Sequence, residues 1–155
     1  MEQAQVLTFL NNKDRDLLLQ FCGYSTTEPL HSFGPAVRPH YIIHFILNGK
    51  GIFQIREKTY HLETGQGFLI EPDELTFYQS DAQEPWEYLW IGFNGKMIPE
   101  FLKQIGLSSA HPIFHCDKKK ELYWLVNDML VHSKSNFSSD LRRTGLLYEF
   151  LSILA

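Results

Sequence analysis

The chain has 155 residues, of which 44% are hydrophobic, so it suits one domain that buries about two thirds of its unfolded surface without disulfide bonds. Its formal net charge of −4 and its scattered basic residues argue against a nucleic-acid-binding surface, which usually shows clustered Lys and Arg. No segment approaches the roughly 20 apolar residues of a membrane span, so we expect no membrane partner.

Residues 1–16 lack the basic segment and long apolar core of a secretory signal. Without secretion, Cys22 and Cys116 are expected to be reduced, structural residues. These features predict a cytoplasmic protein.

Between Tyr41 and Phe93 the sequence predicts short strands separated by turns. Residues 41–47 are rich in β-branched and aromatic side chains, and Asn48-Gly49 after them predicts a two-residue hairpin. A second reversal is predicted at Glu57-Lys58. The further strands are predicted at residues 52–56, 59–62, 67–70, 75–78 and 86–93. Regularly spaced short strands of this kind are typical of a β-sandwich or β-barrel.

After Gly95 the pattern changes to a helical period. Residues 97–105 predict a short helix with Pro99 in its first turn. Residues 118–132 place apolar side chains three and four positions apart, which predicts one apolar helix face. The last helix is predicted to begin with Ser138 or Ser139 as its cap and to run to Ala155. Its apolar stripe consists of Leu147, Phe150, Leu151 and Leu154.

No Gly, Asn or Pro stop signal closes the last predicted helix, so we expect the chain to be one domain of a longer protein. Leu146, Tyr148 and Ile153 lie off its apolar stripe and are expected to remain for another surface. This predicts a homodimer through the C-terminal helices.

Seven histidines raise the question of a metal-dependent barrel enzyme. His40 and His44 would lie on one strand face about 13 Å apart, at ~3.3 Å per residue, which is too far to share a metal with bonds of about 2 Å. No serine or cysteine lies in a recognisable nucleophile motif. We therefore expect no metal, no cofactor and no catalysis. A metal-dependent cupin enzyme, such as an isomerase or dioxygenase, remains the alternative.

Aromatic residues are dense near the end of the predicted barrel. Trp86, Tyr88 and Trp90 share one strand face because side chains alternate. Such rings either fill a core or offer flat platforms for sugar rings, and Arg38 would add hydrogen-bond donors at a pocket mouth. A third reading is an interaction module with a filled barrel, which would lack a cavity of about 300 Å³ or more.

The ordered motifs of residues 38–95 resemble the N-terminal sensor domain of AraC-type transcription regulators. They are Arg38, a Tyr, a Gly-x-Gly turn, a second glycine turn, a Pro-containing turn, Tyr78 and then Pro-Trp-x-Tyr-x-Trp-x-x-Phe at residues 85–93. The helices up to Ala155 fit the layout of the family more loosely. The pattern around Trp86 is also similar to regulators of oligosaccharide or α-galactoside use.

The resemblance implies a mainly β fold, a cupin-like barrel of the double-stranded β-helix or jelly-roll type followed by C-terminal α-helices. It divides the chain into an N-terminal arm (1–20), an effector-binding barrel (21–95) and a helical dimerisation region (96–155). A helix-turn-helix DNA-binding domain would follow, and only that domain would contact DNA. The implied effector is a small molecule, often a mono- or oligosaccharide. Thr76 and Phe77 stand where metal-binding cupins hold histidine, which favours a metal-free sensor.

The resemblance also implies a set of ligand-binding residues. Tyr78 and Trp90 match aromatic positions that contact sugar in the arabinose-responsive member. Tyr88 falls where that member has a polar ring, and Arg38 matches its pocket arginine. Together with His44, these are the predicted ligand-binding residues. The arm of that member closes over its ligand, so residues 1–20 are of interest as well.

Overall fold

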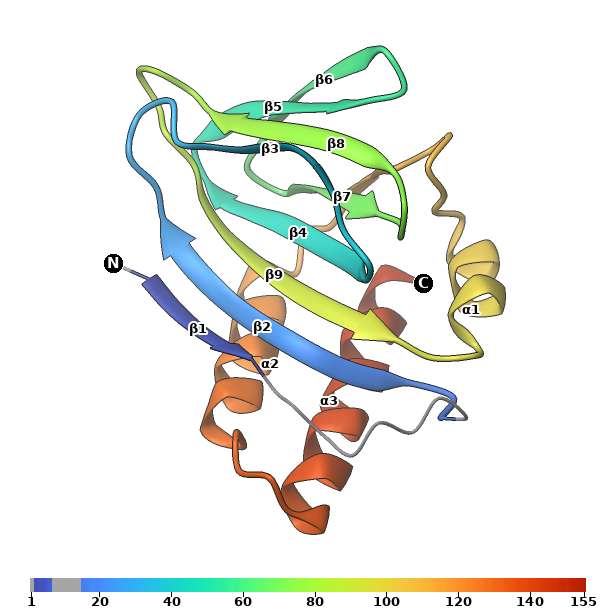
Figure 1. Ribbon diagram of the computed structural model, residues 1–155. Coiled ribbons are helices and arrows are strands. Elements are labelled where there is room, and N and C mark those ends of the chain that lie inside the picture. The colour runs from blue at the N-terminus through green and yellow to red at the C-terminus, as the bar shows by residue number, and fades with distance from the viewer. Residues whose placement is uncertain (1, 7–14) are drawn as a thin grey trace.

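The computed structural model describes residues 2–6 and 15–155, which form two facing antiparallel sheets and three helices (Figure 1). The six-stranded sheet has the order β1-β2-β9-β4-β7-β10, and the four-stranded sheet has the order β3-β8-β5-β6. This arrangement confirms the expected mainly β, cupin-like barrel followed by C-terminal helices. The strands are β1 (Glu2–Val6), β2 (Leu18–Thr26), β3 (Ser32–Val37), β4 (Tyr41–Asn48), β5 (Lys50–Ile55), β6 (Lys58–Glu63), β7 (Gln66–Ile70), β8 (Leu75–Ser80), β9 (Glu87–Asn94) and β10 (Ile113–His115).

The turn at Asn48-Gly49 is not the hairpin that the sequence predicts. β4 pairs with β7 and β9, whereas β5 pairs with β6 and β8, so the chain passes from one sheet to the other at this point. Gly49 has a φ of 78°, and a Cβ there would lie 2.4 Å from the carbonyl oxygen of Pro85. The local signal for a glycine turn was therefore right, but strand pairing depends on residues far along the chain.

The hairpin between β5 and β6 turns at Arg56 and Glu57, which have φ values of 51° and 64°. Ile55 pairs with Lys58 across it, so the turn lies one residue earlier than predicted. The six strands predicted between residues 41 and 93 otherwise correspond to β4 through β9.

The N-terminal part of the chain belongs to the six-stranded sheet. β1 pairs with β2 from Glu2↔Ser25 to Val6↔Phe21, and β2 begins at Leu18. Residues 2–6 and 18–20 of the expected arm are thus strand residues, and the other described positions of the arm are residues 15–17. Positions 1 and 7–14 lie outside the described residues.

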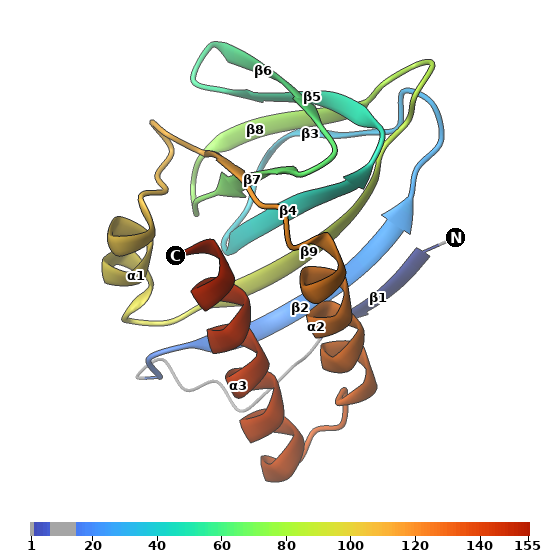
Figure 2. The ribbon, with the colours of Figure 1, turned by 180° about the vertical axis from the view of Figure 1, so that it is seen from behind.

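The three helices are α1 (Ile98–Ile105), α2 (Lys119–Val131) and α3 (Phe137–Leu154). α3 begins two to three residues earlier than predicted, because Asn136 Oδ1 accepts a hydrogen bond of 2.8 Å from the backbone N–H of Ser139. Seen from behind, α2 and α3 lie side by side on the outer face of the six-stranded sheet (Figure 2). Within the part of the chain that the structure describes, no helix is long and apolar enough to cross a membrane.

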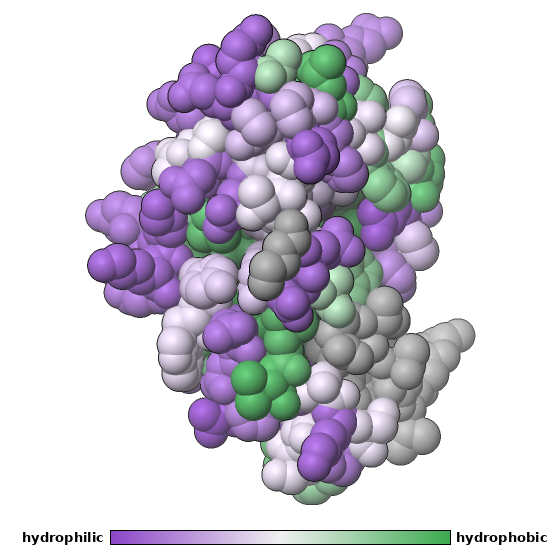
Figure 3. Space-filling view, turned by 90° about the vertical axis from the view of Figure 1, so that its left-hand side faces the viewer, coloured by the Kyte–Doolittle hydropathy of each residue, from purple (hydrophilic) through white to green (hydrophobic). Residues whose placement is uncertain are grey.

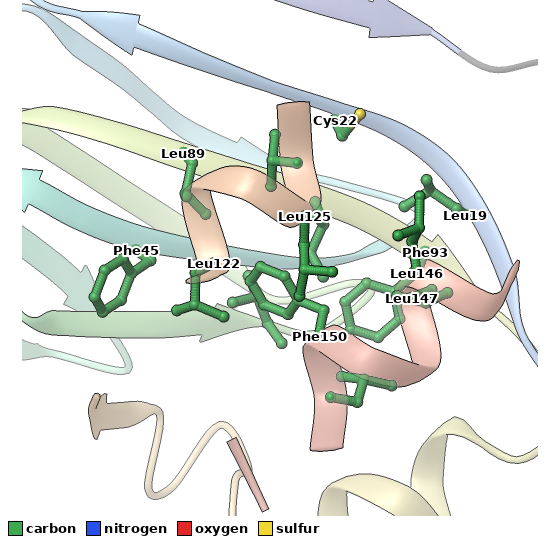
Figure 4. Close-up of a cluster of buried hydrophobic side chains, with 14 of the residues drawn as sticks. Leu19, Cys22, Phe45, Leu89, Phe93, Leu122, Leu125, Leu146, Leu147 and Phe150 are labelled. Atoms are coloured by element: carbon green, nitrogen blue, oxygen red, sulfur yellow. The ribbon is translucent and has the colours of Figure 1, made fainter. Parts of the chain in front are cut away.

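The helical layer buries one apolar face and exposes another. Leu122, Leu125 and Phe150 are at most 3% exposed and pack with Phe45 and Leu89 of the sheet (Figure 4). Leu146 is also buried in this cluster, so the expectation that it remains free for another surface is wrong. Leu146 points to the sheet because the buried stripe of α3 is wider than the one predicted. The exposed apolar residues that face away from the sheet are Trp124, Val131, Phe137, Leu141 and Tyr148. Tyr123 is also exposed, but its ring contacts Tyr24 of β2 at 5.1 Å.

β4 separates two apolar clusters. Ile43, Phe45 and Leu47 belong to the cluster under the helices, whereas Ile42 and Ile46 belong to the cluster inside the barrel. This division follows from the alternation of side chains along a strand. Both faces of β4 are therefore buried, and its inner face borders the interior of the barrel. Cys22 and Cys116 are buried and not joined to each other.

Candidate functional site

An open cavity of about 460 Å³ lies inside the barrel. Strands of both sheets contribute to it, and β1 borders it with the exposed residues Glu2 and Ala4, which share a face of that strand. The volume exceeds the limit for a filled barrel, so the structure does not support the pure interaction module. The lining residues are Glu2, Ala4, Phe21, Cys22, His31, Phe33, Arg38, Ile42, His44, Tyr78, Tyr88 and Trp90.

The inner wall of the cavity is aromatic. Tyr88 and Trp90 come from β9, and their ring centroids are 5.5 Å apart. Behind them, Trp86 is fully buried and stacks on Tyr88 at 5.8 Å. Gly23 on β2 pairs with Trp90, and a Cβ at Gly23 would lie 2.6 Å from the indole ring. The glycine therefore leaves the space in which the Trp90 ring lies across the neighbouring strand.

His44 lies on the inner face of β4 and is 3% exposed. Its ring stacks against Phe68 at 4.6 Å and Tyr88 at 5.3 Å, and it contacts Tyr78 at 4.7 Å. Burial, followed by the positive charge of Arg38, lowers the pKa of His44 to about 3. The imidazole is therefore neutral at physiological pH. Its Nδ1 atom is buried without a hydrogen-bond partner among the described residues.

Arg38 precedes β4 and lies over two rings, 4.8 Å from the centroid of Phe33 and 5.8 Å from that of Phe21. Burial raises the pKa of Tyr78 to about 12, although the charge of Arg38 and hydrogen bonds with Tyr88 and Arg38 oppose this change. Burial likewise raises the pKa of Tyr88. Both tyrosines therefore keep their hydroxyl protons, and at these two positions a ligand meets uncharged hydroxyl groups that donate and accept hydrogen bonds.

The structure places all five predicted ligand-binding residues around this one cavity: Arg38, His44, Tyr78, Tyr88 and Trp90. The other seven lining residues were not predicted as ligand-binding residues. They include Phe21 and Phe33, which lie under the Arg38 guanidinium, and Glu2. Phe21 lies in the mostly apolar stretch of residues 17–22, and this stretch was the available signal in the sequence. Phe33 and Glu2 reach the cavity only because β3 and β1 pair with partners distant in sequence.

A second hollow, of about 620 Å³, lies on the outer face of the four-stranded sheet. Lys50, His61 and Gln79 contribute to it, and these side chains lie on the strand face opposite to Phe53 and Tyr78. We take the smaller barrel cavity as the candidate site, because it contains the buried polar side chains and the aromatic wall.

Among the described residues, no group of three or more His, Cys, Asp or Glu is placed to hold a metal ion. The rings around His44 are Phe68, Tyr78, Tyr88 and Trp90, which are poor partners for a metal site built from imidazole and carboxylate.

The model of a family described as the AraC-like ligand binding domain matches residues 18–151. The chain belongs to this family. The match spans β2 to β10 and the helices up to residue 151. It includes every cavity-lining residue except Glu2 and Ala4 of β1, and it covers the helical region that the sequence resembled only loosely. Membership identifies the barrel and its helices as a ligand-binding domain, and the expectation drawn from the motifs of residues 38–95 is confirmed.

Curated relatives of this domain are named as regulators of operons. The Msm operon regulatory protein of Streptococcus mutans is 37% identical over 143 residues, which cover 90% of this chain and 50% of the relative. The lactose operon transcription activator of Staphylococcus xylosus is 29% identical, with the same coverage of both chains. The raffinose operon transcriptional regulatory protein RafR of Pediococcus pentosaceus is 29% identical and covers 80% of this chain and 50% of the relative. The chain thus spans about half the length of these relatives.

Among solved structures, YhaK from Escherichia coli aligns with a TM-score of 0.53 and 12% identity. The alignment covers 63% of this chain and 46% of YhaK. At this identity the likeness concerns the fold alone.

Proposed function

We propose that this domain binds a sugar effector in the barrel cavity and so controls DNA binding by another part of a longer regulator. The observation that carries the proposal is the convergence of the five predicted ligand-binding residues on one cavity of about 460 Å³. Trp90 and Tyr88 would stack on the apolar face of a sugar ring, while Arg38 and Tyr78 would hydrogen-bond to its hydroxyl groups. The domain would work in the cytoplasm as a sensor and not as an enzyme.

The names of the relatives indicate a class of sugar for the effector. Two of them are named for the lactose and raffinose operons, and both of these sugars contain galactose linked to other sugar units. We therefore propose an oligosaccharide that contains galactose as the effector. Part of such a ligand would extend to the open side of the cavity, where Glu2 and Phe33 lie.

Ligand binding would act on the regulator by shifting an equilibrium between arrangements of the domain. A ligand shifts such an equilibrium only by its differential affinity for the two states. β1, which contributes Glu2 and Ala4 to the cavity, is the part of the expected arm that would contact the effector.

We also propose that the domain forms a homodimer through α2 and α3. Trp124 is 56% exposed and borders two grooves on the helical layer, of about 350 and 280 Å³. Exposed Val131 and Tyr148 extend the apolar surface along both helices. Figure 3 shows apolar side chains among hydrophilic ones in the lower part of one face, where the helices lie. A second copy would cover these side chains.

The first test is a thermal-shift screen of the purified domain against lactose, raffinose, galactose and other sugars. One site filled at 100 times its dissociation constant adds about 2.7 kcal/mol to the free energy of unfolding, so a clear rise in Tm is expected. Trp90→Ala should abolish the rise, because the stacking platform is lost. Leu75→Ala is the control, since this residue is 60% exposed on β8 and lies outside both the cavity and the helical surface. A flat response across the whole panel would contradict the proposal.

Metal analysis addresses the enzyme alternative. Protein purified without chelators should contain no stoichiometric iron, manganese or zinc. A full equivalent of one of these metals would instead favour a metal-dependent cupin enzyme.

A further inference from the structure

His44 lines the cavity, and its ring carries a buried polar atom without a partner among the described residues. The imidazole is 3% exposed and enclosed by aromatic rings, and its Nδ1 atom has no hydrogen-bond partner among the described residues. Buried polar atoms in native proteins nearly always have a partner. Since His44 also lines the cavity, a ligand that fills the cavity meets this ring.

The charge state of His44 limits what that ligand group is. Burial and the nearby Arg38 keep the ring neutral by lowering its pKa to about 3. A neutral imidazole has one donor and one acceptor nitrogen. A hydroxyl group also donates and accepts, so it pairs with either nitrogen. A phosphate oxygen only accepts, so it pairs with the donor nitrogen alone. Its negative charge would also favour a protonated ring, which the burial of His44 and the charge of Arg38 both oppose.

The other charges around the cavity also favour an uncharged ligand. Among the described lining residues, Glu2 and Arg38 carry permanent charges of opposite sign. The guanidinium of Arg38 already lies over the rings of Phe33 and Phe21. A phosphorylated ligand would bring negative charge to a cavity in which the guanidinium is engaged and a carboxylate is also present. An uncharged ligand needs no such compensation.

We propose that His44 hydrogen-bonds to a hydroxyl group of the effector, and that the cavity selects an uncharged saccharide over its phosphorylated form. This inference rests on the proposed sugar-binding function. It adds His44 as a residue that determines specificity, and it specifies that the ligand is uncharged.

The test measures binding of lactose, raffinose and lactose 6-phosphate by calorimetry to wild-type protein and to His44→Phe. Phenylalanine keeps a ring among the aromatic neighbours and removes the unpaired nitrogen, so the variant should fold with an unchanged or higher Tm. Its affinity for the neutral sugar that binds best should fall about tenfold or more. Lactose 6-phosphate should bind wild-type protein at least about tenfold more weakly than that neutral sugar.

Two further variants complete the experiment. His44→Gln keeps a donor and an acceptor, and it should retain part of the affinity that His44→Phe loses. His61→Phe is the matched control, because His61 is exposed on β6 in the outer hollow, and it should bind sugar as the wild type does.

The outcomes separate this inference from the proposed function. Equal affinity of His44→Phe and wild type for a neutral sugar would overturn the role of His44 and leave the sugar sensor standing. The same holds if lactose 6-phosphate binds as tightly as the neutral sugars, or if both His44 variants lose affinity only together with a lowered Tm. Absence of binding of all three probes to wild-type protein would overturn the inference, and a flat response to the full sugar panel would overturn the sensor as well.

Discussion

At the scale of single residues, the cavity holds polar groups that are costly for stability. His44 is the clearest case, since its ring is buried, uncharged and in contact with aromatic rings on several sides. A side chain chosen for packing alone would be apolar at this position. A buried histidine at this position therefore lowers the stability of the fold and places a polar ring beside the cavity.

The low pKa of His44 predicts a pH dependence of stability. The unfolded chain binds a proton at His44 near pH 6.5, whereas the folded protein does so only near pH 3. Between these values the unfolded state binds more protons, so the free energy of unfolding falls as the pH falls. The stability of His44→Phe relative to wild type should therefore increase by about 2 kcal/mol from pH 7 to pH 5. Urea unfolding at both pH values measures the difference, and a constant difference would contradict the neutral ring.

A buried hydroxyl group fixes the chain just before β9. Ser80 is 1% exposed, and its Oγ accepts hydrogen bonds of 2.8 Å from the backbone N–H of Trp86 and from Thr27 Oγ1. Ser80→Ala leaves the Trp86 N–H without this acceptor, while the Thr27 hydroxyl keeps the Trp86 carbonyl oxygen at 2.6 Å, so the change should lower the free energy of unfolding by about 1–3 kcal/mol. Denaturant unfolding measures the loss. Ser138→Ala, at an exposed position of α3, should change stability by about 0.5 kcal/mol at most.

At the scale of secondary-structure elements, Gly49 controls the passage between the two sheets. Its φ of 78° and the short distance that an added Cβ would have to Pro85 exclude larger residues. Gly49→Ala should lower the free energy of unfolding by about 1–3 kcal/mol, as measured by denaturant unfolding. Gly145→Ala is the contrasting control. This helical glycine of α3 has no atom within 4 Å of an added Cβ, so the change should raise stability by about 0.5–1 kcal/mol. Equal effects at both positions would contradict the backbone argument.

The sequence predicted the elements that carry strong local signals. β4 through β9 and the three helices show clear periodicity or turn residues, and each appears within a few residues of its expected place. β1, β2, β3 and β10 were not predicted as strands. β3 contains Gly34-Pro35 and is mostly exposed, and β1 depends on its pairing with β2. Which strands pair could not be predicted either, because local patterns do not specify partners distant in sequence.

Part of the candidate site could also be predicted from local patterns in the sequence. Tyr88 and Trp90 share a face by strand alternation, and the ordered motifs supplied Arg38 and Tyr78. The contribution of Glu2 depends on the position of β1 at the edge of the sheet, which no local pattern specifies.

At the scale of the whole molecule, the exposed face of the helices predicts the oligomeric state. Trp124→Glu would place a charge between the two helical grooves, so it should convert a dimer to a monomer at micromolar concentration. Sedimentation velocity measures this change. Leu75→Glu is the control, because Leu75 is 60% exposed on β8 of the other sheet and should leave the dimer intact. A wild-type monomer at every concentration would contradict the dimer.

β4 and β9 are a wall shared by two compartments. On β9, Tyr88 and Trp90 border the cavity, whereas Leu89 and Ile91 pack under the helices. On β4, His44 borders the cavity, while Ile43 and Phe45 pack under the helices. The two sides are one residue apart, so an effector that moves either strand also moves the floor on which α2 and α3 rest. Substitutions at Ile43 or Leu89 should then imitate or block the effector although they never touch it.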